Sequence, residues 1–177
     1  MKWKTLQNKS SFRVASSKVL SRSDLQTAVV QAKSEGKIVV STNGCFDVLH
    51  IGHIRYLQKA REFGDILVVG VNTDESVQRL KGPTRPLVPE FERAEVLAAL
   101  ECVDYVTVFS EDTPFELCDD IHPDVHVKGG DYVIEQMPEA VPVIKHGGRV
   151  ELISLADINT FGRSTSRLIE KMNSDDE

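Results

Sequence analysis

Short runs of β-branched and other apolar residues alternate with amphipathic stretches along most of the chain. We expect strands at the apolar runs, at residues 38–40, 66–71, 105–108, 125–127 and 150–153. We expect helices between them, at about residues 52–63, 90–100, 113–121 and 138–146, and a last one at 165–172. Nearly continuous apolar strands that alternate with helices indicate a parallel sheet covered on both faces. The pattern therefore predicts a single α/β domain with a Rossmann-like, doubly wound parallel sheet.

Two segments have the composition of a capping box at a helix start. Ser23-Asp24-Leu25-Gln26 precedes an apolar stripe, and Thr113-Pro114-Phe115-Glu116 also places proline at the first helical position. We expect the ordered domain to span residues 23–172, after a flexible basic arm at residues 1–22 and before an acidic tail at residues 173–177. The arm is rich in serine and lacks acidic residues, as a transit peptide does, but we favour a flexible arm.

Composition and charge exclude several classes of protein. The net charge of −6 argues against a nucleic-acid partner bound through a broad basic surface. No apolar run approaches the roughly 20 residues that span a bilayer, so no membrane partner is expected. The three cysteines form no C-x-x-C pair, which favours a reducing, cytoplasmic location over a disulfide scaffold.

The most informative run extends from Asn43 to His53 and links the first expected strand to the next helix. A helix N-terminus presents unpaired N–H groups and a partial positive charge, which suit a phosphate. Gly44 and Gly52 lack a Cβ where a nucleotide would approach the backbone. His50 and His53 are three residues apart at the helix entry, so both imidazoles can face a phosphate from the same side.

Other chemistry fits this run less well. Zinc could be held by Cys45, His50 and His53, but no convincing fourth ligand is in view, and we expect no metal held by the protein itself. No general base is implied beside Cys45, so a space-filling role is favoured over a nucleophile. The absence of a P-loop and of a GxGxxG run disfavours P-loop kinases and dinucleotide dehydrogenases.

Residues 44–47 (Gly-Cys-Phe-Asp) and 50–53 (His-Ile-Gly-His) resemble the signature of the cytidylyltransferase-like nucleotidyltransferase superfamily. Residues 162–166 (Gly-Arg-Ser-Thr-Ser) resemble its second motif, a helix start that holds nucleotide phosphates. The resemblance implies a set of nucleotide-binding residues: Gly44, Cys45, Phe46, His50, Gly52, His53, Asp131, Gly162, Arg163, Ser164 and Thr165.

Residues 42–47, 79–86, 111–114 and 127–132 narrow the match, because they are similar to the D-glycero-β-D-manno-heptose 1-phosphate adenylyltransferases. The similarity covers about residues 18–172. It implies transfer of AMP from ATP to the sugar 1-phosphate, giving ADP-heptose for lipopolysaccharide and pyrophosphate. It also implies Mg²⁺ held mainly by the phosphates of ATP, and a homodimer. Many bacteria carry this activity fused to a heptose kinase domain, for which these 177 residues show no signal.

Such a reaction depends on charge compensation more than on a general base, because the attacking phosphate is already largely ionised at neutral pH. We expect His50, His53 and Lys81 to be catalytic, with Lys81 in a proline-stiffened loop at residues 81–89. The expected substrate-binding residues are Asp47, Lys81, Arg93 and Lys128. Asp47 is expected to position a histidine or a water on Mg²⁺, and Arg93 the loop or the substrate. The remaining histidines, His122, His126 and His146, are expected to be structural or exposed.

Two other functions are compatible with the same motifs. A cytidylyltransferase acting on glycerol 3-phosphate or a similar alcohol phosphate would share the core signature, because phosphate recognition does not select the base. A non-catalytic nucleotide-binding regulator would keep the fold without turnover. The intact histidines and the Ser/Thr-rich second motif favour an enzyme, and the flanking segments favour ATP over CTP.

Overall fold

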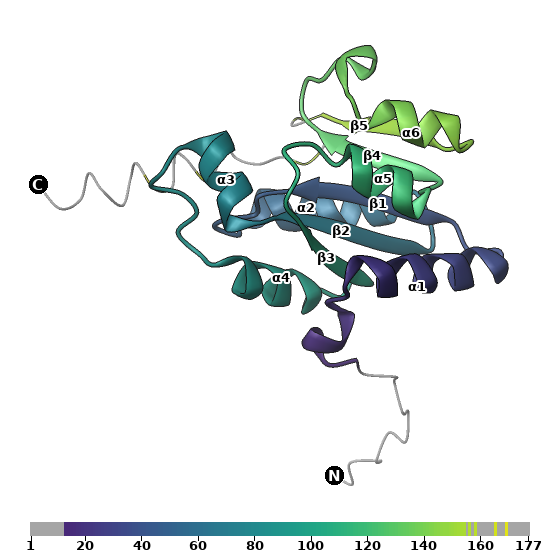
Figure 1. Ribbon diagram of the computed structural model, residues 1–177, viewed down its shortest axis with the longest axis horizontal. Coiled ribbons are helices and arrows are strands. Elements are labelled where there is room, and N and C mark those ends of the chain that lie inside the picture. Colours follow the sequence, from purple (N-terminus) through teal and green to yellow (C-terminus); the bar gives the residue numbers. More distant parts are fainter. Residues whose placement is uncertain (1–12, 155, 157, 159–164, 166–168, 170–177) are drawn as a thin grey trace, which may run out of the picture.

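The computed structural model describes residues 13–154 together with residues 156, 158, 165 and 169. Its centre is a parallel five-stranded sheet with the strand order β3-β2-β1-β4-β5 (Figure 1). The strands are β1 (Val39–Gly44), β2 (Ile66–Asn72), β3 (Tyr105–Phe109), β4 (Val125–Gly129) and β5 (Arg149–Ile153). Each coincides with an expected strand, although β1 and β4 extend further at their carboxyl ends.

Helices cover both faces of this sheet. They are α1 (Arg22–Ser34), α2 (Ile51–Arg61), α3 (Asp74–Lys81), α4 (Glu90–Ala98), α5 (Phe115–Ile121) and α6 (Ala140–Lys145), with 3₁₀ turns at Ala15–Lys18 and Ile134–Gln136. Alternate strand residues enter two separate cores, with Val39 and Val68 in one and Val40 and Leu67 in the other. The first core includes α1 and α5, and the second includes α2 and α4. The expected doubly wound fold is confirmed.

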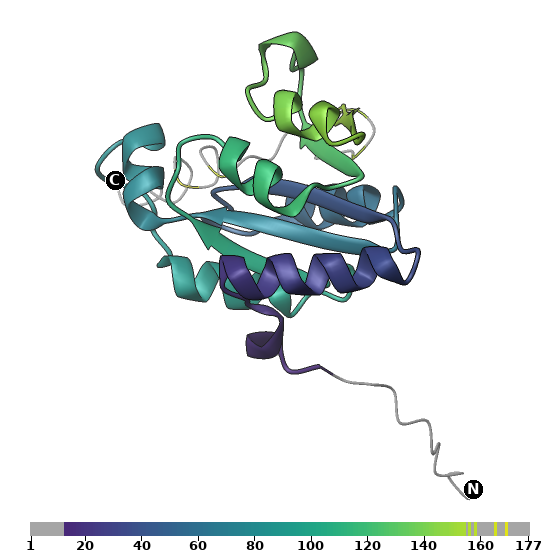
Figure 2. The same cartoon turned by 45° about the vertical axis from the view of Figure 1, so that its right-hand side comes forward.

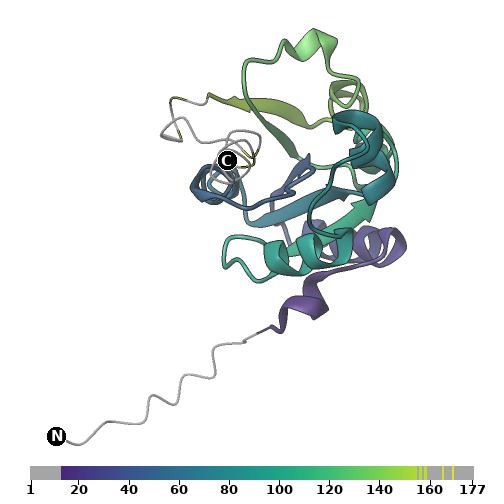
Figure 3. The same ribbon diagram turned by 90° about the vertical axis from the view of Figure 1, so that its left-hand side faces the viewer.

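The views agree with this division into layers. Figure 2 shows α1 running across the front of the sheet, with α2 on the far side. Helix α3 follows β2 directly and lies beyond the carboxyl edge of the sheet, at the left of Figure 1. Figure 3 looks onto this edge, with α2 and α3 on either side of the strand ends. No helix within the described residues is long and apolar enough to cross a bilayer.

Three local expectations were wrong. Helix α1 begins after Ser21, whose hydroxyl accepts a hydrogen bond from the Asp24 N–H, so Ser23 is not its cap. Helix α5 begins at Phe115 without a side-chain cap, because Pro114 rather than Thr113 occupies the cap position. Helix α3 was not expected at all. Thr73 caps it by accepting from the Ser76 N–H, a start signal that lies within the polar run after β2.

The described part of the expected flexible arm packs against the domain. Lys18 is buried, and its ammonium donates to the carbonyl oxygens of Leu100 and Val103 at 3.2 and 2.9 Å. Val19 forms a parallel bridge to Val106 in the edge strand β3, so the chain covers this edge. The arm boundary at residue 22 is therefore corrected to a point before Ala15. The expected acidic tail at residues 173–177 lies outside the described residues.

Candidate active site

A cleft of about 680 Å³ opens at the carboxyl edge of the sheet. The chain leaves β1 toward β2 on one side and returns to β4 on the other, so the strand order reverses between β1 and β4. Ligands of open α/β sheets bind at such a reversal. The cleft is lined by residues from the loops after both strands, from α2 and from the α3 region: Asn43, Gly44, Cys45, Phe46, Asp47, His50, Gly52, His53, Tyr56, Asn72, Leu80, Lys81, Arg85, Asp112, Lys128, Gly129, Tyr132, Ile158 and Thr165.

The turn from β1 to α2 contains a strained residue. Phe46 has a φ of 47°, a left-handed conformation that costs a bulky residue roughly 1–2 kcal/mol. Its ring is buried and meets the His53 ring edge-on, with 5.4 Å between the centroids. A Cβ added at Gly44 would lie 3.0 Å from the Phe46 ring, so the turn itself accounts for this glycine. The strained turn thus supports the imidazole of His53.

The two imidazoles lie together at the start of α2, as the sequence predicted. His50 is the cap residue, and its Nδ1 accepts a hydrogen bond from the Gly52 N–H at 3.1 Å. Because Nδ1 is the acceptor, the ring proton is on Nε2, which makes Nε2 a donor. The His50 and His53 rings are stacked, with 3.9 Å between the centroids.

His53 is neutral at neutral pH. Burial, and secondarily the neighbouring His50, lower the pKa of His53 to about 4. Its Nδ1 is buried without a hydrogen-bond partner among the described residues. His53 therefore presents a neutral ring to the cleft, and such a ring can still donate a hydrogen bond.

Tyr56, one turn along α2, ties this helix to the sheet. Its hydroxyl donates to the Val127 carbonyl oxygen of β4 at 2.9 Å and lies 2.6 Å from the Thr42 hydroxyl of β1. A Cβ at Gly129 would lie only 2.8 Å from the Tyr56 ring. The close contact fixes the start of α2 over the point where β1 and β4 meet.

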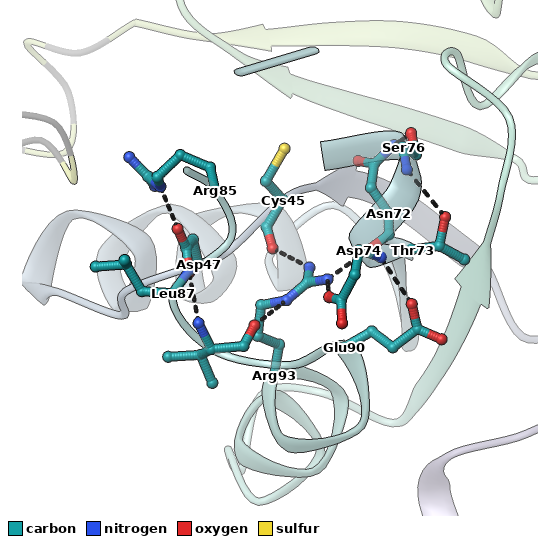
Figure 4. Close-up of polar contacts among 11 residues, drawn as sticks. Cys45, Asp47, Asn72, Thr73, Asp74, Ser76, Arg85, Leu87, Glu90 and Arg93 are labelled. Carbon is teal, nitrogen blue, oxygen red and sulfur yellow. Dashed lines mark hydrogen bonds and ion pairs between the residues drawn. The ribbon is translucent and has the colours of Figure 1, made fainter. Parts of the chain in front are cut away.

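Asp47 holds the proline-containing loop against the site. Its buried carboxylate accepts hydrogen bonds from the backbone N–H groups of Leu87 and Val88, at 2.7 and 3.0 Å, and from Nε of Arg85. Figure 4 shows the Arg85 guanidinium extending from this carboxylate. The expectation that Asp47 positions a histidine is therefore corrected, because its hydrogen-bond partners among the described residues all belong to the loop. Arg85, for which no role was expected, lines the cleft.

Arg93 is buried, so of its two expected roles, orienting the loop or contacting the substrate, the structure supports the first and corrects the second. Its side chain has no exposed surface, and its guanidinium donates to backbone carbonyl oxygens and to one carboxylate (Figure 4). The acceptors are the carbonyls of Cys45, Asn72 and Val88 and the Asp74 carboxylate. These groups come from the ends of β1 and β2, the loop and the start of α3. Arg93 therefore positions the elements around the cleft.

Not all of the remaining residues that were expected to bind substrate line the cleft. Lys81 lines the cleft from the last turn of α3, so it is not in the loop as expected. Lys128 lines the cleft at the end of β4. Asp131 is exposed and does not belong to the cleft lining. Cys45 lines the cleft, and burial raises the pKa of its thiol, which disfavours a nucleophilic thiolate.

The second motif is described only in part. Thr165 is helical, lines the cleft, and its hydroxyl donates to the Val48 carbonyl oxygen at 3.4 Å. This contact joins the second motif to the turn before His50. Gly162, Arg163 and Ser164 lie outside the described residues, as does most of the expected helix at residues 165–172.

The other histidines have structural surroundings. His126 is fully buried, with Nδ1 2.8 Å from the Ser41 hydroxyl, whereas His122 and His146 stack on each other away from the cleft, with 3.6 Å between the centroids. Within the described residues, no cluster of three His, Cys, Asp or Glu side chains is arranged to hold a metal ion.

The chain matches a known family over most of its length. The family model described as Cytidylyltransferase-like matches residues 41–171, which include the whole β1–α2 turn and the second motif. Among curated proteins, the chain is 55% identical over 156 residues to the bifunctional protein HldE of Syntrophotalea carbinolica and 57% identical over 156 residues to that of Citrifermentans bemidjiense. Each match covers 88% of this chain and 31% of the relative, so the chain spans about a third of these relatives.

A solved structure supports the same assignment. The lipopolysaccharide core biosynthesis protein of Thermoplasma volcanium is 31% identical and superposes with a TM-score of 0.56, over 67% of this chain and 96% of that one. The shared fold, the matched family model and the imidazole pair at the mouth of α2 agree with one another. The chain belongs to the cytidylyltransferase-like family of nucleotidyltransferases.

Proposed function

We propose that this protein transfers AMP from ATP to D-glycero-β-D-manno-heptose 1-phosphate, releasing pyrophosphate. The observation that carries the proposal is the stacked pair of His50 and His53 at the N-terminus of α2, inside a cleft of about 680 Å³. Such a cleft has the size of a small-molecule site, and the helix start suits a phosphate. The heptose specificity rests on the similarity of the flanking segments and on the relatives named bifunctional protein HldE.

The hydrogen-bond donors of the cleft suggest which residues bind which phosphates. His50 donates through Nε2, and His53 offers a neutral ring beside it, both toward the phosphates of ATP. Thr165 and the proposed ligands Gly162, Arg163 and Ser164 would hold the phosphates that leave. Binding a triphosphate next to His53 would raise the pKa of this imidazole, so charge compensation would develop together with the bound anion.

The end of α3 and the loop after it form one wall of the cleft, the loop wall, which suits the attacking phosphate. Lys81 lines it from the last turn of α3 and Arg85 from the loop. Arg85 uses only Nε on Asp47, so both Nη groups lack a partner among the described residues. A guanidinium fixed by one carboxylate presents its remaining donors in the planar arrangement that matches phosphate oxygens. We therefore add Arg85 to the proposed substrate ligands.

The carboxylates of the cleft fit a metal carried by the nucleotide. Asp47 and Asp112 line the cleft, but Asp47 already accepts three hydrogen bonds and Asp112 is paired with Arg79 at 2.8 Å. The described residues form no cluster of three carboxylate, imidazole or thiol side chains around these two, so Mg²⁺ is proposed to be held by phosphate oxygens, where it would neutralise their charge. A homodimer and a cytoplasmic location belong to the same proposal.

Pyrophosphate release tests the function directly. The purified chain is assayed with ATP or CTP, each combined with heptose 1-phosphate, other sugar 1-phosphates or glycerol 3-phosphate. We expect the highest kcat/KM with ATP and heptose 1-phosphate. Preference for CTP would replace the proposal with a cytidylyltransferase, and tight ATP binding without pyrophosphate from any acceptor would replace it with a non-catalytic nucleotide-binding protein.

A further inference from the structure

Lys128 is held in place by two neighbours at the point where the strand order reverses. Its Nζ donates to the Asn43 side-chain oxygen at 2.8 Å and to Oε1 of Glu139 at 2.9 Å. Asn43 is near the end of β1, Lys128 near the end of β4, and Glu139 directly precedes α6. The bonds therefore join both strands of the reversal to a helix start, and they fix the ammonium in the cleft wall.

The charge of this ammonium is already compensated. The Glu139 side chain is only 4% exposed, and that of Lys128 16%. Burial alone would raise the pKa of Glu139, but the charge of Lys128 and its hydrogen bond outweigh burial and hold this pKa below its usual value. A buried ion pair of this kind has little net charge to offer a phosphate. Acceptors among the described residues engage two of the three N–H bonds of the ammonium, and the third remains for a ligand, beside the Tyr132 ring, whose centroid is 5.7 Å from Nζ.

The layer beneath the pair carries no charge that could replace Glu139. His126 lies two residues before Lys128 on β4, and its Nδ1 is bonded to the Ser41 hydroxyl. Burial, and secondarily the charge of Lys128, lower the pKa of His126, so this imidazole is neutral. The Cys118 thiol lies 3.6 Å from the same nitrogen, and burial raises its pKa to about 12. Glu139 is thus the carboxylate that sets the position of Lys128 among the described residues.

We infer that Glu139 is a positioning residue, and that the Glu139-Lys128-Asn43 set forms a subsite for a hydroxyl group of the acceptor sugar. A hydroxyl can accept a hydrogen bond from Lys128 and donate one to a nearby oxygen. Because it is uncharged, a site without net charge can bind it. The heptose offers more hydroxyls than the ribose of ATP does, which favours the acceptor as occupant. The inference rests on the proposed function and adds the residues that distinguish a sugar phosphate from other phosphates.

Steady-state kinetics of Glu139→Gln test the inference, with KM measured separately for ATP and for heptose 1-phosphate. The amide keeps one acceptor for Lys128 but removes the compensating charge. We expect KM for the sugar phosphate to rise about tenfold, the scale of one weakened hydrogen bond to a charged group, while KM for ATP stays within about twofold. Glu139→Asp, which keeps the charge but shortens the side chain, should act in the same direction.

A double-mutant cycle tests whether Glu139 acts through Lys128. Lys128→Met should also raise KM for the sugar phosphate, and adding Glu139→Gln to it should cause no further rise. The double variant removes both charges together, which spares the fold an unpaired buried carboxylate. Glu135→Gln is the matched control: Glu135 is exposed in the neighbouring 3₁₀ turn, and its substitution should leave both KM values unchanged.

The outcomes separate the inference from the proposed function. If the wild-type chain releases pyrophosphate but Glu139→Gln leaves the acceptor KM unchanged, or raises both KM values equally, the subsite is wrong and the function stands. An effect of Glu139→Gln that persists in the Lys128→Met background overturns the positioning role. Absence of pyrophosphate with every acceptor overturns both.

Discussion

The loop wall and the β4 wall, which contains Asn43 and Lys128, each hold a cation by a buried carboxylate, but the cations differ. On the loop wall the buried carboxylate of Asp47 holds Arg85, and on the β4 wall the buried carboxylate of Glu139 holds Lys128. The carboxylate side chains are 1% and 4% exposed, and both cations are 16% exposed. In each pair, a buried acid fixes the direction of a cation that lines the cleft.

The difference lies in the donors that remain. Among the described residues, Arg85 uses Nε on Asp47 and keeps both Nη groups, whereas Lys128 uses two of its three N–H bonds and keeps one. A pair of parallel donors suits phosphate, and a single donor in a compensated pair suits a hydroxyl. We propose that the number of unengaged donors, more than the presence of a positive residue, determines which part of the substrate each wall binds.

The largest effect should come from the imidazoles between the walls. His53→Ala removes a preorganised donor at the phosphates, and we expect kcat to fall by on the order of 10²–10³. Single-turnover measurements would separate this loss from product release. A wall variant with a larger effect than His53→Ala would break the comparison, because the walls would then carry the chemistry rather than the orientation of the substrate.

Acid should destabilise the folded protein, because the fold holds His53 and His126 neutral. The folded protein holds the pKa of His53 near 4 and that of His126 below its usual value, whereas unfolded imidazoles titrate near 6.5. The unfolded chain therefore binds more protons between these values, and stability falls as pH drops below about 6.5. For His53 alone the free energy of unfolding should fall by roughly 2 kcal/mol from pH 7 to pH 5.

Urea denaturation at several pH values measures this loss. His126→Gln keeps a hydrogen-bonding partner for Ser41 but cannot be protonated, so its stability should depend less steeply on pH than that of the wild type. If the free energy of unfolding depends on pH as steeply in His126→Gln as in the wild type, His126 is not held neutral beneath Lys128.

The loop wall is tested by Arg85→Lys. A lysine can still pair with Asp47, but it lacks the planar donors, so inhibition by inorganic phosphate should weaken about tenfold. The same inhibition should change little in Glu139→Gln, because the β4 wall is expected to bind a hydroxyl. If phosphate inhibition weakened equally in Arg85→Lys and Glu139→Gln, the two walls would not differ in the groups they bind.

The smallest effect on kcat/KM is expected for Cys45→Ser, in the turn between β1 and α2. Burial raises the pKa of the Cys45 thiol, so no thiolate nucleophile is available near neutral pH. We expect less than about a threefold change in kcat/KM. Loss of activity on alkylation of wild-type protein, matched by loss in Cys45→Ser, would instead indicate a chemical role for the sulfur.

Local periodicity and motif spacing predicted the sheet, the two helix layers and the imidazole pair. These depend on near neighbours in sequence: β1 is an apolar run, and His50 and His53 are three residues apart. Helix α3 was missed because its exposed, polar sequence carries only one buried apolar side chain, Val77. Its Thr73 cap was the available signal.

The roles of the charged residues could not be predicted in the same way. Asp47 belongs to the first motif and Arg93 to none. The loop partners of Asp47 and the Cys45 partner of Arg93 are 38–48 residues away in sequence. Glu139 carries no motif, and its contact with Lys128 depends on where α6 begins. Whether a charge faces a ligand or a carboxylate is decided by tertiary packing, which a single sequence does not display.

The central claim is that the start of α2 binds the triphosphate through His50 and His53. A crystal structure with a non-hydrolysable ATP analogue and Mg²⁺ tests it most directly. We predict phosphate oxygens within hydrogen-bond distance, about 3 Å, of both rings, with the base and ribose in the same cleft. A triphosphate bound elsewhere on the sheet edge, with the imidazoles facing the protein interior, would contradict the account.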